Sequence, residues 1–420
     1  NANSEVFGAT FGYASGSGIG NLGVAGLYMG NTITSTTIAQ VESGVDLVAA
    51  ALGNGAADVG LNVVANNRVD FIILAGGSGD GASVGVGASA AVTKVTKVTK
   101  ALIGSAELGT VKSGTVDVAG DVLVDAKSEG LLISAAVSSA WATGKKAPAG
   151  GSTPPAVNSN YGVSAAGAFI YNDADYTTSA NVSNLLSFSA ANMSVNAYEG
   201  GGVYAFPIAY ASSEANKFAL AAAGVVLIND VDITLSAGVS QITTLSLSQL
   251  SINANNNSTI VTTSLSLGMA SIAQTSVGSS SSIALTGNVA INNVNNNIDA
   301  YLNDIGTMTV SGANASGIGA SIEAKDESEI YAVAAGVAYA GNGAVGVTYA
   351  ENNIISNTDA LIDSIDLTMH SGSVKLTADS EADILSVALG ASVVFGTTTG
   401  TNTQVGLSVA AAISANVVRA

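Results

Sequence analysis

The stretch "NNNIDAYLNDI" (residues 295–305) has a near copy in "ISNTDALIDSI" (residues 355–365), and this repetition decides the fold. The pair Asp299-Ala300 returns as Asp359-Ala360, an offset of 359 − 299 = 60 residues. Each copy runs from polar, turn-forming residues into a short apolar strand, and neither contains a catalytic motif. A fixed period of this size is typical of architectures in which one unit stacks on the next. We therefore expect the chain to be an array of stacked units.

Two further elements recur with a similar spacing. Runs of glycine, alanine, valine and serine begin near Ala82, Phe218 and Ser281, and the last two lie 281 − 218 = 63 residues apart. The second element has an acidic tip, and its copies are "VLVDAKSEGLL" (122–132), "ASIEAKDESEI" (320–330) and "VKLTADSEADI" (374–384). Since the elements keep one order along the chain, they define a unit of about 60 residues.

The local pattern predicts strands rather than helices. Many segments alternate apolar and polar residues with period two, and none shows a long 3.6-residue period. Tandem strands without helices predict an all-β chain folded as a parallel β-helix (β-solenoid). With 20 to 30 residues per rung, the unit would hold two or three rungs, giving a rod of ~14 to 21 rungs, on the order of 65 to 100 Å long. Asp299 and Asp359 would then occupy the same corner of successive coils, and asparagines at such corners would stack their amides.

Composition indicates a narrow core. Hydrophobic residues make up 48% of the 420 residues, but aromatic residues only 5%, and there are 49 glycines. Such a chain can fill a thin space lined by small side chains, but it cannot fill a wide globular core. Charged residues are 10%, against about 25% in an ordinary soluble domain.

Charge and hydropathy exclude several classes of partner. The net charge is −18, from 12 Lys and Arg against 30 Asp and Glu, and no basic face for nucleic acid is visible. The charge-free segment 331–350 is built on Gly and Ala and is interrupted by Asn342, so we predict no membrane span. Without cysteine, disulfides and thiolate metal sites are ruled out, and we expect no cofactor.

One segment departs from the repeat. "WATGKKAPAGGSTPPAVNSN" (141–160) holds three of the four prolines and lengthens its unit. Because proline cannot donate to a strand ladder, we expect a surface loop, either a tolerated insertion or a contact loop presenting Trp141, Lys145 and Lys146. We therefore expect one continuous solenoid over residues 1–420 with a loop at 141–160. Since neither end shows a cap, we expect it to be part of a longer chain or a piece that stacks axially on other copies.

The acidic tips are the candidate metal ligands. If they stack along one edge, their carboxylates could bind Ca²⁺ between coils, because this cation prefers several oxygen ligands. The alternative is a solvated acidic edge that deters unwanted strand pairing. The residues concerned are Asp326, Glu327, Glu329, Asp379, Glu381 and Asp383.

The run "VTKVTKVTK" (92–100) has period three. In a strand, Lys94 and Lys100 lie on one face and Lys97 on the other. This pattern predicts a poorly buried strand or an exposed edge protected by lysines, with a small polyanion-binding strip as the alternative.

The repeats resemble those of leukotoxin-like filamentous adhesins, which are large bacterial exoproteins of the autotransporter and two-partner secretion (type V) classes. The resemblance rests on "GAVGVTYAENNIISNTDALIDS" (343–364) followed by "SVKLTADSEADILSVALGASV" (373–393), and it extends best over residues 82–420. It implies a right-handed parallel β-helix, export, and a stalk at the bacterial cell surface.

We therefore expect a structural and adhesive stalk segment without enzymatic activity, which extends and displays regions that bind a surface receptor or glycan. One alternative is a self-assembling extracellular filament subunit. The other is a carbohydrate-active β-helix enzyme, which would use paired carboxylates such as Asp326 and Glu327.

Overall fold

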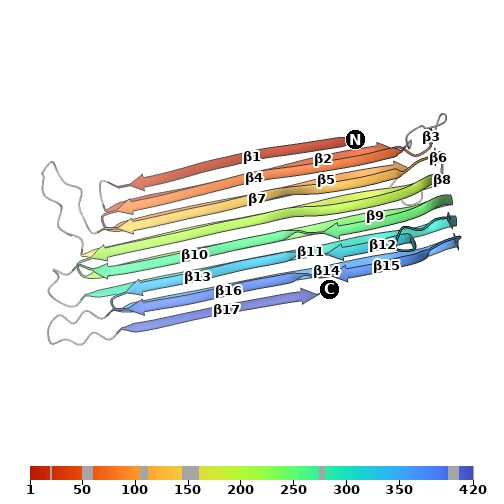
Figure 1. Cartoon of the computed structure of the whole chain (residues 1–420). Coiled ribbons are helices and arrows are strands. Elements are labelled where there is room, and N and C mark those ends of the chain that lie inside the picture. The colour runs from red at the N-terminus through yellow and green to blue at the C-terminus, as the bar shows by residue number, and fades with distance from the viewer. Residues whose placement is uncertain are drawn as a thin grey trace.

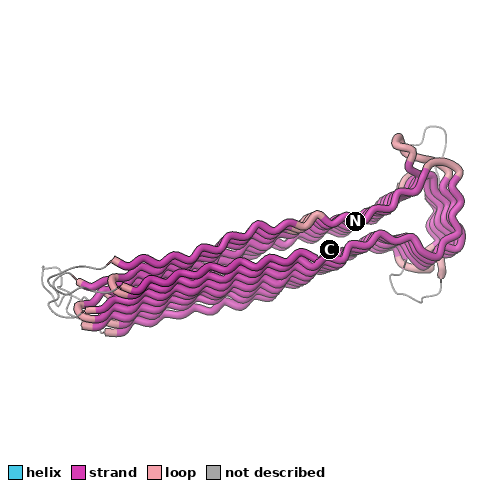
Figure 2. Tube along the Cα trace, turned by 90° about the horizontal axis from the view of Figure 1, so that it is seen from below, coloured by secondary structure: helices cyan, strands magenta, loops and turns pink. Residues whose placement is uncertain are grey.

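The computed structural model describes residues 1–18, 21–49, 60–104, 112–143, 160–273, 280–395 and 406–419. These residues form a parallel β-solenoid of flattened coils, in which two long sheets lie face to face and a short third wall closes one end (Figures 1 and 2). Every paired strand is parallel to its neighbours. The predicted all-β solenoid is therefore confirmed.

The first long sheet holds strands that run from the wide end toward the narrow tip. They are β1 (Ala2–Ser17), β4 (Leu61–Gly81), β7 (Val122–Ala142), the last part of β8 (Tyr161–Ala215), β10 (Thr259–Ile272), β13 (Glu329–Ala340) and β16 (Asp383–Val394).

The second long sheet returns from the tip. It consists of β2 (Leu22–Val41), β5 (Val84–Gly104), the first part of β8, the first part of β9 (Phe218–Asn256), β11 (Ser281–Val310), β14 (Gly343–Met369) and β17 (Leu407–Arg419).

The third wall forms the wide end visible in Figure 2. It combines β3 (Asp46–Ala49), β6 (Thr115–Val118) and the middle parts of β8 and β9, and β12 (Ile318–Asp326) and β15 (Ser373–Ser380) lead from it into the first sheet.

The expected division of the repeat into two or three rungs is wrong. Asp299 pairs directly with Asp359, and Leu220 pairs directly with Ile283, so one unit of about 60 residues makes one coil. Strands of about 20 residues explain the difference, because each long wall of the coil is a single strand of about 65 Å. Seven coils at 4.8 Å give a stack of about 34 Å, far shorter than the predicted rod.

The predicted alignment of the acidic-tip segments is confirmed by the register. Ala324 pairs with Ala254 and Ala378, and Ala126 pairs with Ala65 and Ala197. Asp299 and Asp359 also occupy equivalent positions, although within a strand rather than at a corner.

Asparagine stacking is found inside the core. A ladder of buried amides runs along the axis, each side-chain amide donating to the next carbonyl at 2.7 to 2.9 Å. Its buried members are Asn172, Asn229, Asn292 and Asn352, and the exposed Asn416 of the last coil continues it. These asparagines lie in the middle of strands, so the ladder ties successive coils together from within.

Candidate functional site

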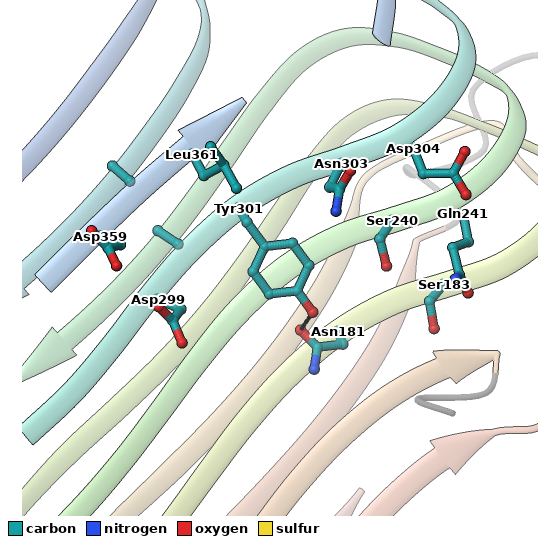
Figure 3. A pocket seen from close by; sticks show the side chains of 12 residues that line it. Asn181, Ser183, Ser240, Gln241, Asp299, Tyr301, Asn303, Asp304, Asp359 and Leu361 are labelled. Atoms are coloured by element: carbon teal, nitrogen blue, oxygen red, sulfur yellow. Dashed lines mark hydrogen bonds between the residues drawn. The ribbon is translucent and has the colours of Figure 1, made fainter. Parts of the chain in front are cut away.

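A hollow on the surface forms a crease where the second sheet bends into the wide end (Figure 3). Four residues in the left-handed region make this bend in successive coils, with φ of 60° at Asn184, 55° at Gln241, 52° at Asp304 and 55° at Ser364. A left-handed residue turns the chain sharply, and Asn and Asp adopt this conformation more readily than most residues. The repeated bend therefore creates a concave strip parallel to the solenoid axis.

The crease has a volume of about 570 Å³, which lies in the range of small-molecule sites. It crosses strands of four successive coils, β8, β9, β11 and β14, a span of about 14 Å along the axis. Its lining is Asn181, Ser183, Ser240, Gln241, Asp299, Ala300, Tyr301, Asn303, Asp304, Asp359, Ala360 and Leu361.

Tyr301 forms the floor of the crease. Its ring lies over Gly238 of the preceding coil, where an added Cβ would come within 2.2 Å of the ring. Its hydroxyl donates to Asn181 Oδ1, one coil further, at 3.1 Å. Burial raises the pKa of the Tyr301 hydroxyl, so this group stays a neutral donor. Gly238 thus allows a tyrosine to lie along the axis with its ring against the backbone.

Carboxylates lie beside the ring. Asp299 and Asp359 are direct neighbours in the ladder, and each accepts a hydrogen bond from an asparagine two residues earlier, Asn297 at 2.8 Å and Asn357 at 3.0 Å. Burial is the main cause that raises the pKa of Asp299, and the nearby Asp359 carboxylate adds to it. A cation lies at the bend, where Lys112 Nζ is 3.5 Å from Asp304 Oδ1.

This chemistry fits a neutral, hydroxyl-rich ligand better than an anion. The crease offers an aromatic ring, amide groups and carboxylate acceptors, and its acidic groups would repel a negatively charged molecule. Within the described ranges, no three His, Cys, Asp or Glu side chains are placed so that they could hold a metal ion.

The predicted calcium ligands are only partly brought together. Glu327 and Glu381 are neighbours at one edge, as are Glu329 and Asp383, but Lys325 lies between the acidic groups, 2.5 Å from Glu327 and 3.7 Å from Glu381. The ion pairs with Lys325 belong to neither the calcium site nor the solvated acidic edge considered above, and calcium binding stays a prediction.

Asp326 lies inside the core rather than at the edge. It is fully buried, and it accepts hydrogen bonds from the amides of Asn256 and Asn296 at 2.8 Å each and from the backbone N–H of Ser328 at 3.2 Å. The alternation of the strand explains the difference, because Lys325 and Glu327 face outward and the residue between them faces inward. Asp326 therefore cannot touch a surface substrate.

The contact loop falls largely outside the described residues, including Lys145 and Lys146. Trp141 belongs to β7 rather than to a loop, and its ring lies 4.8 Å from that of Tyr210 on the outer surface. The prediction that Trp141 belongs to a contact loop is therefore wrong.

The lysine run is placed differently from the prediction. Lys94 and Lys97 do lie on opposite faces of β5, but β5 is an interior strand and Lys97 is buried. Lys97 Nζ lies 2.8 Å from Glu199 Oε1 and 3.9 Å from the centre of the Tyr176 ring, and side-chain exposures of 2% and 0% mark a fully desolvated ion pair. Sequence alternation predicted the two faces but not which one points inward.

The sequence analysis missed the crease. Two features of the sequence indicate the crease. A polar residue recurs five residues after the aspartate of each Asp-Ala pair, at Asp304 and Ser364, and a glycine, Gly238, lies under the ring of Tyr301. No family model, curated protein or solved structure significantly matches this chain.

Proposed function

We propose that this chain is a structural and adhesive stalk segment of a secreted filamentous adhesin at a bacterial cell surface. The observation that carries the proposal is the unbroken parallel register, which joins every coil to the next across both long sheets. Each added unit of about 60 residues would lengthen such a stack by about 4.8 Å without changing its core. This geometry supports extension and display as the role of the chain.

The internal asparagine ladder supports a stiff column. Its buried amides link coils that are about 60 residues apart in the chain, for example Asn229 to Asn292 and Asn292 to Asn352. Sliding one coil relative to the next would break these hydrogen bonds and leave buried polar groups without partners, at a cost of about 1 to 3 kcal/mol for each group.

A coil deletion tests the structural role. Removing residues 283–342 joins Ser282 to Gly343, which keeps the register because Leu220 pairs with Ile283 and Ile283 pairs with Gly343. We expect a folded protein, shorter by one coil, that still supports attachment of cells displaying it. Loss of attachment by a variant that stays folded would place the function in the deleted coil and would contradict a purely structural role.

Electron microscopy of the native surface material separates the stalk from a self-assembling filament. Single tapering rods are expected for a stalk, and uniform filaments with a regular subunit repeat are expected for axial assembly.

The crease supports a second candidate function, the binding of a neutral glycan. A sugar ring could lie against Tyr301 while the amide of Asn303 and the carboxylates of Asp299 and Asp359 bind its hydroxyls. The test is calorimetric titration with dextran, mannan and xyloglucan.

We expect one of these polysaccharides to bind, and Tyr301→Ala to weaken that binding about tenfold, which corresponds to ~1.4 kcal/mol. The matched control is Tyr349→Ala on the same sheet, whose hydroxyl donates to Glu351 Oε2 at 2.6 Å outside the crease. Equal binding by both variants, or no binding by the unmodified protein, would contradict this function.

A further inference from the structure

The outer surface of the first sheet is divided into a charged part and an apolar part. In the half near the tip, successive coils place large apolar side chains at equivalent outward positions. β1 has five such positions from Ala9 to Ser17, and among these residues and their ladder partners in the other coils the charged residue is Asp80. We call this surface the apolar face. It is represented by Phe11, Leu74, Val137, Ile208, Leu265 and Leu389.

The same strands are charged toward the wide end. There, equivalent outward positions hold Arg68, Glu129, Glu327 and Glu381. Lys127 lies on the same surface and forms an ion pair with Glu129 at 2.9 Å. The coils that contain β8 and β10 have Gly200 and Asn257 at this position instead, so the charged surface is formed by five of the seven coils, whereas the uncharged positions of the tip half begin at the ladder position of Ala9 in each coil. A general excess of apolar residues over the whole chain would not produce such a boundary.

The side chains of the apolar face are substantially exposed. Val137 is 47% exposed, Leu389 55% and Trp141 40%. Aromatic rings also pair on the outside, Trp141 with Tyr210 at 4.8 Å and Tyr339 with Phe395 at 5.1 Å. Contiguous exposed apolar surfaces larger than a few hundred Å² mark interaction sites in soluble proteins.

The size of the apolar face matches a protein interface. Eight residues along the strand cover about 26 Å, and seven strands cover about 34 Å, so the face measures about 900 Å². A standard specific interface buries about 800 Å² on each partner.

The shape selects the kind of partner. The face is a flat sheet with side chains at regular strand spacing, and two such surfaces pack well at about 10 Å, as in a β-sandwich. A second copy of this chain meets the requirements for flatness and spacing, and Asp80 is the charged residue at the outward positions that it would cover.

We propose that two copies of this chain pair laterally through the apolar face, sheet against sheet. This contact lies at right angles to axial stacking and is separate from the stalk function. It would bury the exposed aromatic pairs and leave the charged surface of the wide half in water.

The absence of cysteine from the chain allows a direct distance test. Leu265→Cys and Val226→Cys place a single spin label on opposite outer surfaces, at positions with 37% exposure each. Lateral pairing predicts a distance between the labels below about 25 Å for Leu265→Cys, whereas axial stacking predicts about 34 Å or more. For Val226→Cys, lateral pairing predicts more than about 30 Å, because both copies lie between the labels.

A charge variant provides the second test. The side chain at position 265 points away from the core, so Leu265→Lys should leave the midpoint of unfolding in urea unchanged. Dimerisation measured by sedimentation should weaken about 100-fold, because a lysine would be buried in the contact without a partner. Val226→Lys is the matched control and should dimerise as the unmodified chain does. A monomeric unmodified protein at about 50 μM, or equal dimerisation of both variants, would overturn the proposal.

Discussion

The narrow half and the wide half of each coil share one backbone ladder but fill the space between the sheets in opposite ways. Near the tip, a Cβ added to Gly79 would lie 1.9 Å from the Val86 carbonyl oxygen of the opposite sheet, and one added to Gly87 would lie 1.9 Å from that of Ser139. The sheets therefore meet backbone to backbone. Contacts of this kind between Cα–H groups and carbonyl oxygens recur between adjacent strands and contribute weakly.

At the wide end, the sheets are held apart by large side chains. Phe188, Leu245 and Met308 are almost completely buried against the third wall. The separation of the sheets thus follows side-chain volume along a single strand, from glycine at the tip to phenylalanine and leucine at the far end (Figure 2). The comparison shows that a repeated sequence can encode a wedge as well as a column of constant width.

The two halves meet at a buried polar zone. Lys97 and Glu199 lie in it, together with Asp326 and the asparagine ladder. Here the gap is too wide for backbone contact, and polar side chains from both sheets reach one another, as in the hydrogen bond of 2.7 Å from Ser35 to Asn67.

The largest expected effect comes from breaking the ion pair in this zone. Lys97→Met leaves the Glu199 carboxylate buried with Thr178 and the Gly201 N–H as its remaining donors. We expect a loss of about 3 to 5 kcal/mol in the free energy of unfolding, because the uncompensated charge stays in a medium of low polarity. This loss in the free energy of unfolding is measured by urea unfolding at pH 7.

Two variants accompany this measurement. Lys94→Met, three residues earlier on the outer face, removes the exposed pair with Asp173 and should cost less than about 1 kcal/mol. The double variant Lys97→Met with Glu199→Leu should recover most of the stability, since it removes both charges. A double variant as unstable as the single one would show that the pair itself is not the cause.

The next effect tests the narrow half. Gly79→Val introduces a side chain where Val86 O leaves no room, so the sheets must separate, and we expect a loss of about 3 kcal/mol. Gly224→Val is the control, because nothing lies within 4 Å of a Cβ at this outward position. Valine favours strands, so this control should be neutral or slightly stabilising in urea unfolding. Similar losses in both variants would mean that strand glycines matter for reasons other than sheet separation.

Much of the fold could be predicted from the sequence because repetition and period-two alternation directly reflect stacking and burial. Ala126, Ala324 and Ala378 were aligned correctly because the acidic tips around them are well preserved. The size of the coil could not be predicted in this way. Strands of 20 residues contain turn-forming residue types in their interior, such as Gly30 and Asn31 in β2, so these residues do not show where a wall ends. Usual strands have about 5 or 6 residues.

The candidate site could be predicted only in part. Alternation places Asp299 and Tyr301 on the same face, but the crease also needs the bend at Asp304 and the absence of a side chain at Gly238 in the preceding coil. Such a contact depends on the register between coils, which follows from the coil length. The burial of Asp326 was missed for a similar reason, since composition makes a run of charged residues look exposed.

A smaller effect is expected from the asparagine ladder. Asn292→Ala removes the acceptor of Asn229 and the donor to Asn352, both at 2.7 Å in the core, and should cost about 2 kcal/mol. Its neighbour Asn293 faces outward, and Asn293→Ala should cost less than about 0.5 kcal/mol. Asn293 also hydrogen-bonds between coils, donating to Asp230 at 2.7 Å and accepting from Asn353 at 3.0 Å. The ratio of the two losses in urea unfolding therefore measures how much burial adds to such hydrogen bonds, and equal losses would assign no special role to burial.

The smallest effect concerns the outer face of the wide half, at Asp299 and Asp359. The pKa of Asp299 is raised, so the folded chain holds this proton more tightly than the unfolded chain, and stability falls as the pH rises above the ordinary value of 3.8. Asp359→Asn removes the neighbouring charge and keeps an oxygen that can accept from Asn357. We expect a gain of a few tenths of a kcal/mol at pH 7, and little gain near pH 3, where the raised pKa of Asp299 keeps this carboxyl protonated and removes the repulsion.

For the matched control of this variant, the expected change in stability has the opposite sign. Asp173 lies on the same outer face with Lys94 Nζ at 2.7 Å, so Asp173→Asn should lower stability slightly at pH 7. The comparison is made by urea unfolding at both pH values. If Asp359→Asn instead lowers stability at pH 7, the two aspartates do not repel one another, and the pKa of Asp299 reflects its burial alone.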